Sequence, residues 1–126
     1  MAGSLRIRLE DGWYGVPLAR VHRVAGFAAL AGEPDEYFLG WLTFQGKQAP
    51  VFDLNRVMCE KATPEQFGTR IVLIEMGPDA SVPYVGLLAA GVTDTCRADE
   101  PGVTPLDVDL YLQMLANFIP TPPKAA

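Results

Sequence analysis

The sequence predicts a mainly β domain made of small antiparallel barrels, with short helices attached. Short runs of β-branched and aromatic residues alternate with polar positions, and glycine or proline interrupts these runs at regular intervals. Stretches with helical spacing are few. With 126 residues, of which 49% are hydrophobic, the chain has the size and composition of one folded unit. We therefore expect a single domain over residues 1–126.

A β-hairpin is the first element expected. Apolar and charged residues alternate over residues 5–9, and an extended pattern resumes over residues 13–16. Asp11 and Gly12 stand between the two runs, and glycine accepts the backbone conformation that a tight turn requires.

A short helix is expected next, from about Pro17 to Ala25. Pro17 fixes φ where a first helical turn can begin, valine and leucine then recur at helical spacing, and Gly26 can end the element.

A second hairpin is expected around Gly46, which joins extended runs at residues 41–44 and 49–54. The turn needs a residue that accepts positive φ, and Gly46 is such a residue. Pro50 has no N–H to donate to a neighbouring strand, so it favours an edge position.

Two further strands follow a polar connection. Residues 69–75 are rich in β-branched side chains and are short, which favours a buried strand over a helix. Residues 82–97 predict a long strand that is kinked near Gly91, where the missing side chain tolerates a bulge.

The last third of the chain predicts a loop, an amphipathic helix and a tail, the helix and tail together covering about residues 104–126. Thr104, Pro105 and Asp107 fit the start of a helix that runs from Leu106 to Ile119, and prolines end it. The apolar face is expected to hold Leu110, Met114, Leu115 and Phe118, and the opposite side Asp109, Gln113, Ala116 and Asn117. A strand remains an alternative, because Val108, Leu110, Leu112 and Met114 also alternate.

Charge and hydropathy exclude several partners. The net charge is −5 and the ten basic residues are scattered, which argues against nucleic acid. No apolar stretch approaches the roughly 20 residues of a membrane helix, so direct membrane insertion is not expected. The N-terminal residues show no secretory pattern, which predicts a cytoplasmic protein.

Chemically reactive residues are few. Cys59, Cys96 and His22 match no common metal-ligand spacing, and no cofactor motif is present, so we expect no metal, no cofactor and no catalytic residue. In a reducing compartment we expect the two cysteines to be free thiols and not to form a disulfide. A small enzyme that uses His22 with a cysteine stays a remote alternative, because Arg20 and Arg23 disfavour an imidazolium beside them.

Four ordered landmarks carry a family resemblance. They lie at residues 14–24, 38–46, 50–54 and 85–94, and together they resemble the CheW family over about residues 5–97. The resemblance implies two intertwined SH3-like barrels with a hydrophobic core between them. It also implies a bacterial adaptor without catalytic chemistry, which couples a chemoreceptor's cytoplasmic tip to the regulatory domain of a CheA-type histidine kinase.

The same resemblance implies partner-binding residues. Those expected near the receptor-facing groove are Val21, Arg23, Phe44, Gln45 and Gly46, and those expected on the second barrel are Val92, Thr93 and Asp94. Asp53 is interpreted instead as a carboxylate that caps a turn.

Three departures from the family pattern matter. Arg23 stands where the family often has glutamate, and Gln45 stands where it has arginine, which suggests a degenerate CheW-like domain in a different signalling complex as the alternative function. After Arg97 the segments that close the second barrel in the family are absent, so the C-terminal part is expected to be shortened and the closure incomplete. Either the helix of residues 106–119 covers the gap, or a second chain does so in a homodimer.

Overall fold

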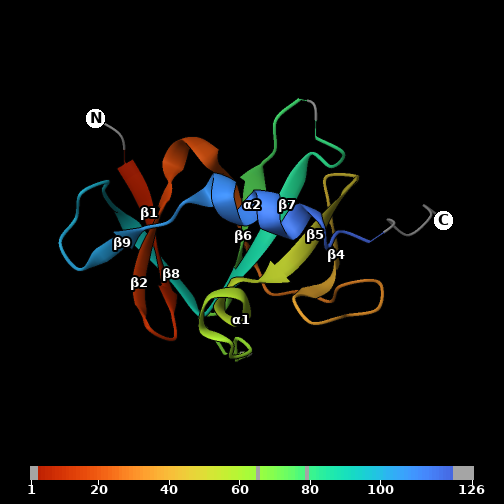
Figure 1. Cartoon of the computed structure of the whole chain (residues 1–126), viewed down its shortest axis with the longest axis horizontal. Coiled ribbons are helices and arrows are strands. Elements are labelled where there is room, and N and C mark those ends of the chain that lie inside the picture. Colours follow the sequence, from red (N-terminus) through yellow and green to blue (C-terminus); the bar gives the residue numbers. More distant parts are fainter. Residues whose placement is uncertain (1–2, 65, 79, 121–126) are drawn as a thin grey trace.

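The computed structural model describes residues 3–64, 66–78 and 80–120, and it is mainly β, as predicted. Its described strands form a four-stranded sheet in the order β8-β1-β2-β9 and a five-stranded sheet in the order β3-β6-β7-β5-β4 (Figure 1). The strands are β1 (Gly3–Leu9), β2 (Gly12–Pro17), β3 (Val21–Gly26), β4 (Phe38–Phe44), β5 (Lys47–Asp53), β6 (Arg70–Glu75), β7 (Tyr84–Ala89), β8 (Gly91–Arg97) and β9 (Val103–Pro105). The helices are α1 (Leu54–Cys59), α2 (Val108–Ala116) and the 3-10 turn η1 (Leu18–Arg20). Most pairings are antiparallel, but β5 with β7 and β2 with β9 are parallel.

The first predicted hairpin is confirmed as β1 and β2, which pair from Ser4 with Pro17 to Leu9 with Gly12. The Tyr14 hydroxyl donates a hydrogen bond that is shared by the two carboxylate oxygens of Asp11, at 3.0 and 2.9 Å. The turn is therefore tied to the strand that follows it.

The surroundings of Tyr14 are expected to make the protein less stable at alkaline pH. Burial, and then the Asp11 carboxylate that accepts the hydroxyl proton, raise the pKa of Tyr14 from 10.0 to about 12. Because the folded-state pKa is the higher one, the contribution to stability is complete below the unfolded pKa and is lost as the pH rises through the folded pKa. We expect the urea midpoint of the wild-type protein to fall between about pH 10 and 12, and Tyr14→Phe to remove most of that fall. An equal fall in both proteins would contradict the assignment.

The predicted helix over residues 17–25 is wrong. Only Leu18–Arg20 forms a 3-10 turn, and Val21–Gly26 is strand β3, which pairs with β6. Val21 and Val24 suit a strand because their branched side chains lose rotamer freedom in a helix, and pairing with a buried strand outweighs the local helical spacing.

The second hairpin is confirmed as β4 and β5, but the edge position expected for Pro50 is wrong. Strand β5 lies between β4 and β7, so β4 is the edge. The ladder to β7 begins with Val51 opposite Gly86, directly after Pro50. The N–H that proline lacks is therefore not needed in that ladder.

Helix α1 follows β5 directly and was not predicted. Asp53 is its N-cap and accepts a hydrogen bond from the N–H of Arg56 at 3.2 Å. Glu60 ends the helix in the left-handed region, with φ of 59°. The capping role inferred for Asp53 is confirmed.

The strand expected over residues 69–75 is confirmed as β6, but the single long strand expected over residues 82–97 is two strands, β7 and β8. Strand β6 is buried from Ile71 to Ile74, and the predicted kink separates β7 from β8 at Ala90. The two halves belong to different sheets, so this segment carries the chain from one sheet to the other.

The predicted C-terminal helix is present as α2, and the strand alternative is excluded. Asp107 is the N-cap, and its carboxylate accepts a hydrogen bond from the N–H of Leu110 at 3.1 Å. Thr104 and Pro105 lie in β9 and not at the start of the helix.

The predicted apolar face of α2 is mostly wrong. Of the predicted residues only Leu115 is buried, whereas Leu110, Met114 and Phe118 are 57%, 41% and 40% exposed. Val108 and Leu112 complete the buried side. Because apolar residues occur on both sides of this helix, spacing alone cannot select the face that packs.

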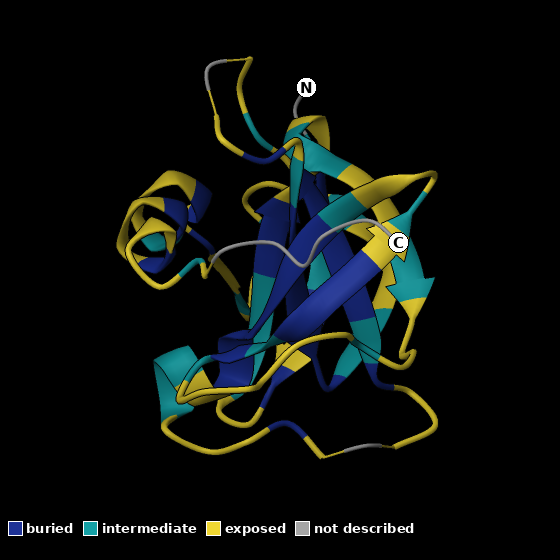
Figure 2. Cartoon of the chain, turned by 90° about the vertical axis from the view of Figure 1, so that its right-hand side faces the viewer, coloured by how far each residue is buried: buried dark blue, intermediate teal, exposed yellow. Residues whose placement is uncertain are grey.

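One core lies between the two sheets and α2. A second core lies on the other face of the five-stranded sheet. Figure 2 shows the buried residues concentrated along the strands and the exposed residues in the loops. The first core includes Leu5, Ile7, Val16, Phe38, Phe52, Leu87, Leu112 and Leu115. The second consists of Leu42, Ala49, Val51, Ile71, Leu73 and Leu88.

The C-terminal residues cover the first core from within the chain. Strand β9 extends the four-stranded sheet beside β2, and the N–H of Leu106 donates to the carbonyl of Gly15 at 2.9 Å. Helix α2 then crosses the junction of the two sheets (Figure 1). The helix alternative is thus the one that the structure shows, and self-association stays a prediction for light scattering.

Candidate partner-binding surface

Four of the five residues in the first predicted group lie together at one end of the five-stranded sheet, whereas Val21 packs partly against the first core. Val21 and Arg23 lie on β3, and Phe44 is the last residue of β4. These strands are the two edges of the sheet, yet the Arg23 guanidinium carbon lies 5.4 Å from the centre of the Phe44 ring. The side chains of the two edge strands therefore touch.

Sequence reasoning missed two residues that complete an aromatic cluster with Phe44. The ring of His22 stacks on Tyr84 with centroids 4.5 Å apart, and it meets Phe44 edge to face at 5.7 Å. Phe44 and Tyr84 are 6.0 Å apart, also edge to face. Tyr84 begins strand β7, so only the sheet order brings it close, and the local sequence holds no signal for this.

A β-bulge explains why neighbouring residues of β3 both reach Phe44. Val21 pairs with Ile74 and Arg23 with Leu73, so His22 is an extra residue in the ladder. A bulge breaks the alternation of side chains across the sheet. His22 and Arg23 can therefore face the same aromatic ring.

Gln45 and Gly46 form the tight turn between β4 and β5. Both have positive φ, 51° for Gln45 and 77° for Gly46, as the central residues of a type I′ hairpin turn do. The conformation predicted for Gly46 is confirmed. Gln45 adopts a conformation that costs a residue with a side chain about 1–2 kcal/mol.

Gln45→Asn is expected to stabilise the protein by roughly 0.5–1 kcal/mol, because asparagine tolerates the left-handed region better in this turn. Urea unfolding measures the change. Gln113→Asn makes the same chemical change on the exposed side of helix α2, where asparagine is the weaker helix former, and should lower the stability. A loss at Gln45 as large as the one at Gln113 would contradict the turn assignment.

Some of the charged side chains around the cluster lie close to a group of opposite kind, and others do not. The His22 Nδ1 atom lies 3.3 Å from Glu75 Oε1, at the end of β6. The side chain of Arg23 makes no ion pair or hydrogen bond with a described residue. The same holds for the side chain of Lys47, which stands opposite Phe44 in the hairpin. We call His22, Arg23, Phe44, Lys47 and Tyr84 the cation–aromatic surface.

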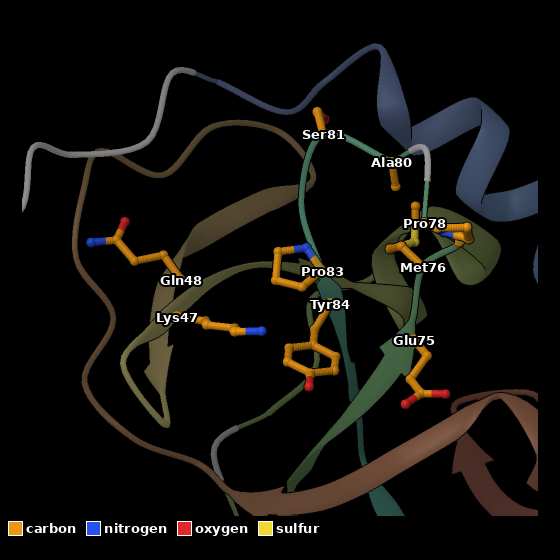
Figure 3. A pocket seen from close by; sticks show the side chains of 10 residues that line it. Lys47, Gln48, Glu75, Met76, Pro78, Ala80, Ser81, Pro83 and Tyr84 are labelled. Carbon is orange, nitrogen blue, oxygen red and sulfur yellow. The ribbon is translucent and has the colours of Figure 1, made fainter.

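A hollow of about 640 Å³ adjoins this surface. Figure 3 shows Lys47 pointing toward Tyr84 from the hairpin side, with Pro83 just before β7, Met76 just after β6, and Glu75 directed away from Lys47. Backbone of the β6–β7 connection frames the opposite wall, at Gly77. The hollow thus combines apolar, aromatic and charged lining.

The second group of predicted residues lies elsewhere. Val92, Thr93 and Asp94 are on β8, in the four-stranded sheet, where a register shift places two residues of β8 opposite Arg6. Arg6 Nε donates to Thr93 Oγ1 at 2.9 Å, and its guanidinium lies 4.9 Å from the Trp13 ring. Val92 packs partly against the first core, and Asp94 is exposed. The structure does not bring this group into contact with the first.

Asp53 and the cysteines lie outside both groups. The Asp53 carboxylate is buried and accepts hydrogen bonds from the N–H and the hydroxyl of Thr63, at 2.8 and 2.5 Å. Burial and the nearby Asp11 carboxylate raise the pKa of the Cys59 thiol. His22 has Phe44, Tyr84 and Glu75 as its described neighbours, so neither cysteine is paired with it there.

The described residues also lack two kinds of site. They contain no group of three or more histidine, cysteine or acidic side chains that could hold a metal ion. No helix among them is long and apolar enough to cross a membrane.

Comparisons with known proteins agree with this fold. A family model described as the CheW-like domain matches residues 4–114, which extends past Arg97 into helix α2. The crystal structure of the scaffolding protein TtCheW from Thermoanaerobacter tengcongensis is similar, with a TM-score of 0.66 and 23% sequence identity. The similarity covers 79% of this chain and 63% of that chain, so the match spans less than two thirds of TtCheW. A search of the curated proteins finds no match.

CheW-like proteins are non-catalytic chemotaxis scaffolds and adaptors that act through protein–protein contacts. Because the family model covers most of its length and the two-sheet fold is the same, the chain belongs to the CheW-like domain family.

Proposed function

We propose that this chain is a cytoplasmic, non-catalytic adaptor that couples the cytoplasmic tip of a bacterial chemoreceptor to the regulatory domain of a CheA-type histidine kinase. The observation that carries the proposal is the cation–aromatic surface at the end of the five-stranded sheet. Aromatic and arginine side chains are the residues that contribute most to protein interfaces. Here they stand together on a member of a scaffold family.

The separation of the two groups fits an adaptor. The cation–aromatic surface lies on the five-stranded sheet, and Val92, Thr93 and Asp94 lie on β8 of the four-stranded sheet. Two surfaces on different sheets allow one chain to hold two partners at once. We propose that both groups contact partners.

A binding experiment tests this function. A receptor cytoplasmic tip and a kinase regulatory domain from the same genome are titrated separately into the labelled chain. We expect both to bind, and Phe44→Ala to weaken binding of the tip by roughly tenfold or more, as loss of an interface anchor does. Phe67→Ala is the matched control, since Phe67 is 97% exposed and makes no aromatic contact with the described cluster. If neither partner bound at high micromolar concentration, the proposal would be refuted.

The departures at Arg23 and Gln45 favour one second candidate, a CheW-like domain that serves a different signalling complex. Arg23 contacts Phe44, and Gln45 follows in the turn, so both departures change the same surface. The double variant Arg23→Glu with Gln45→Arg separates the candidates. A gain of affinity for a receptor tip indicates an altered groove, and no gain indicates a different partner.

The remote enzyme alternative has its own test. Burial and Asp11 raise the pKa of Cys59, which lowers its thiolate fraction at neutral pH and slows alkylation. We expect alkylation of Cys59 and Cys96, achieved at alkaline pH, to leave partner binding unchanged. A loss of function that follows the alkylation of either thiol without unfolding would favour the enzyme.

A further inference from the structure

We infer that the cation–aromatic surface recognises an acidic protein segment, in which a carboxylate side chain stands next to a bulky apolar one. The inference rests on the proposed function for the partner being a protein, and it adds the chemistry of that partner. Three features carry it: two cations that form no ion pair with a described residue, an aromatic support beneath one of them, and an adjoining hollow.

The cations are the first feature. Arg20, Lys61 and Arg97 each pair with a carboxylate of the same chain. Arg23 and Lys47 make no such pair with a described residue, and neither do Arg6, Arg8, Arg56 and Arg70; what distinguishes Arg23 and Lys47 is their place beside Phe44. Both are exposed, and they flank Phe44 from β3 and from the β4–β5 hairpin. A carboxylate from a partner can therefore bind there without displacing the carboxylate of any described residue.

The aromatic support is the second feature. The Arg23 guanidinium lies over the Phe44 ring, and Phe44 is itself held by His22 and Tyr84. A cation placed over an aromatic face keeps its N–H groups directed outward and loses less conformational freedom on binding. Arginine then offers two parallel hydrogen bonds to one carboxylate, which lysine cannot do.

The hollow is the third feature. Its 640 Å³ exceed the volume of one large side chain, and Met76, Pro83 and Tyr84 form the apolar part of a mixed lining, beside Lys47. Figure 3 shows the Tyr84 ring between Lys47 and Glu75. Glu75 is a carboxylate on the lining; it lies 3.3 Å from His22, and Figure 3 shows it directed away from Lys47. An apolar side chain next to the bound carboxylate can enter this hollow.

The test uses two fluorescein-labelled helical peptides that contain leucines at helical spacing. One peptide has glutamates beside the leucines, and the other has lysines at the same positions. Fluorescence anisotropy is measured at low and high salt. We expect the glutamate peptide to bind roughly tenfold or more tightly than the lysine peptide, with a difference that shrinks at high salt.

Variants locate the preference. Arg23→Glu should abolish it, and Arg23→Lys should reduce it, because the charge remains while the paired hydrogen bonds are lost. Arg8→Glu is the matched control, since Arg8 is exposed on β1 of the other sheet and makes the same change in net charge. Circular dichroism confirms that each variant is folded.

Several results would overturn the inference: binding of neither peptide, equal binding of both, or an equal effect of Arg8→Glu and Arg23→Glu. These results are distinct from a failure of the proposed function. If the kinase regulatory domain still binds while the peptide preference is absent, only the inference fails. If the preference is present while neither the receptor tip nor the kinase domain binds, the proposed function fails and the acidic segment belongs to another protein.

Discussion

Leu115→Ala is expected to destabilise the protein by about 2–5 kcal/mol, which is among the largest effects of any single truncation here. The Leu115 side chain is 1% exposed, on the side of α2 that packs into the core between the sheets. Removing it leaves a cavity in the first core, and a packed core closes such a cavity only in part. The free energy of unfolding in urea measures the loss.

Leu110→Ala is the control for this prediction. It removes the same atoms from the same helix, but at a position that is 57% exposed. Its effect should stay within about 0.5 kcal/mol. If Leu110→Ala were as damaging as Leu115→Ala, the orientation of α2 would be incorrect, and the face expected from the sequence would be the packed one.

Asp53→Ala is the second large effect, and we expect a loss of about 2–4 kcal/mol. The carboxylate is 2% exposed and accepts hydrogen bonds from the N–H of Arg56 and from the N–H and hydroxyl of Thr63. Without it, α1 loses its N-cap, and the polar groups of Thr63 lose their acceptor in a buried position.

Asp107→Ala provides the comparison, because Asp107 is also an aspartate N-cap but is exposed, at the start of α2. Its removal should cost only about 1 kcal/mol, since water can satisfy the freed N–H. Urea unfolding of the two variants side by side measures the contribution of burial. Similar losses for both would show that the bonds to Thr63 contribute nothing.

The sequence predicted those elements whose local pattern and final environment agree. Both hairpins were found, because alternation and a turn residue are local signals that the sheet preserves. The segment 17–25 was mistaken for a helix, since the decisive contact is pairing of Val24 with Val72, far away in the sequence. Helix α2 was found, but its packed face was not, because its apolar residues surround it.

The candidate site was predictable only in part, for the same reason. Arg23 and Phe44 were singled out through a family resemblance, and the structure brings them into contact. His22 and Tyr84 join them through a bulge in β3 and through the order of the strands, neither of which is a local property. The role of any of these residues in binding stays a prediction.

Reconstituted signalling tests the central claim most directly. Receptor-containing membrane vesicles and a CheA-type kinase from the same genome are mixed with and without the chain, and autophosphorylation of the kinase is measured. We expect the receptor to change kinase activity only when the chain is present, and we expect Phe44→Ala to remove this effect while Phe67→Ala does not. Kinase activity that is independent of the chain, at concentrations that saturate binding, would contradict this claim.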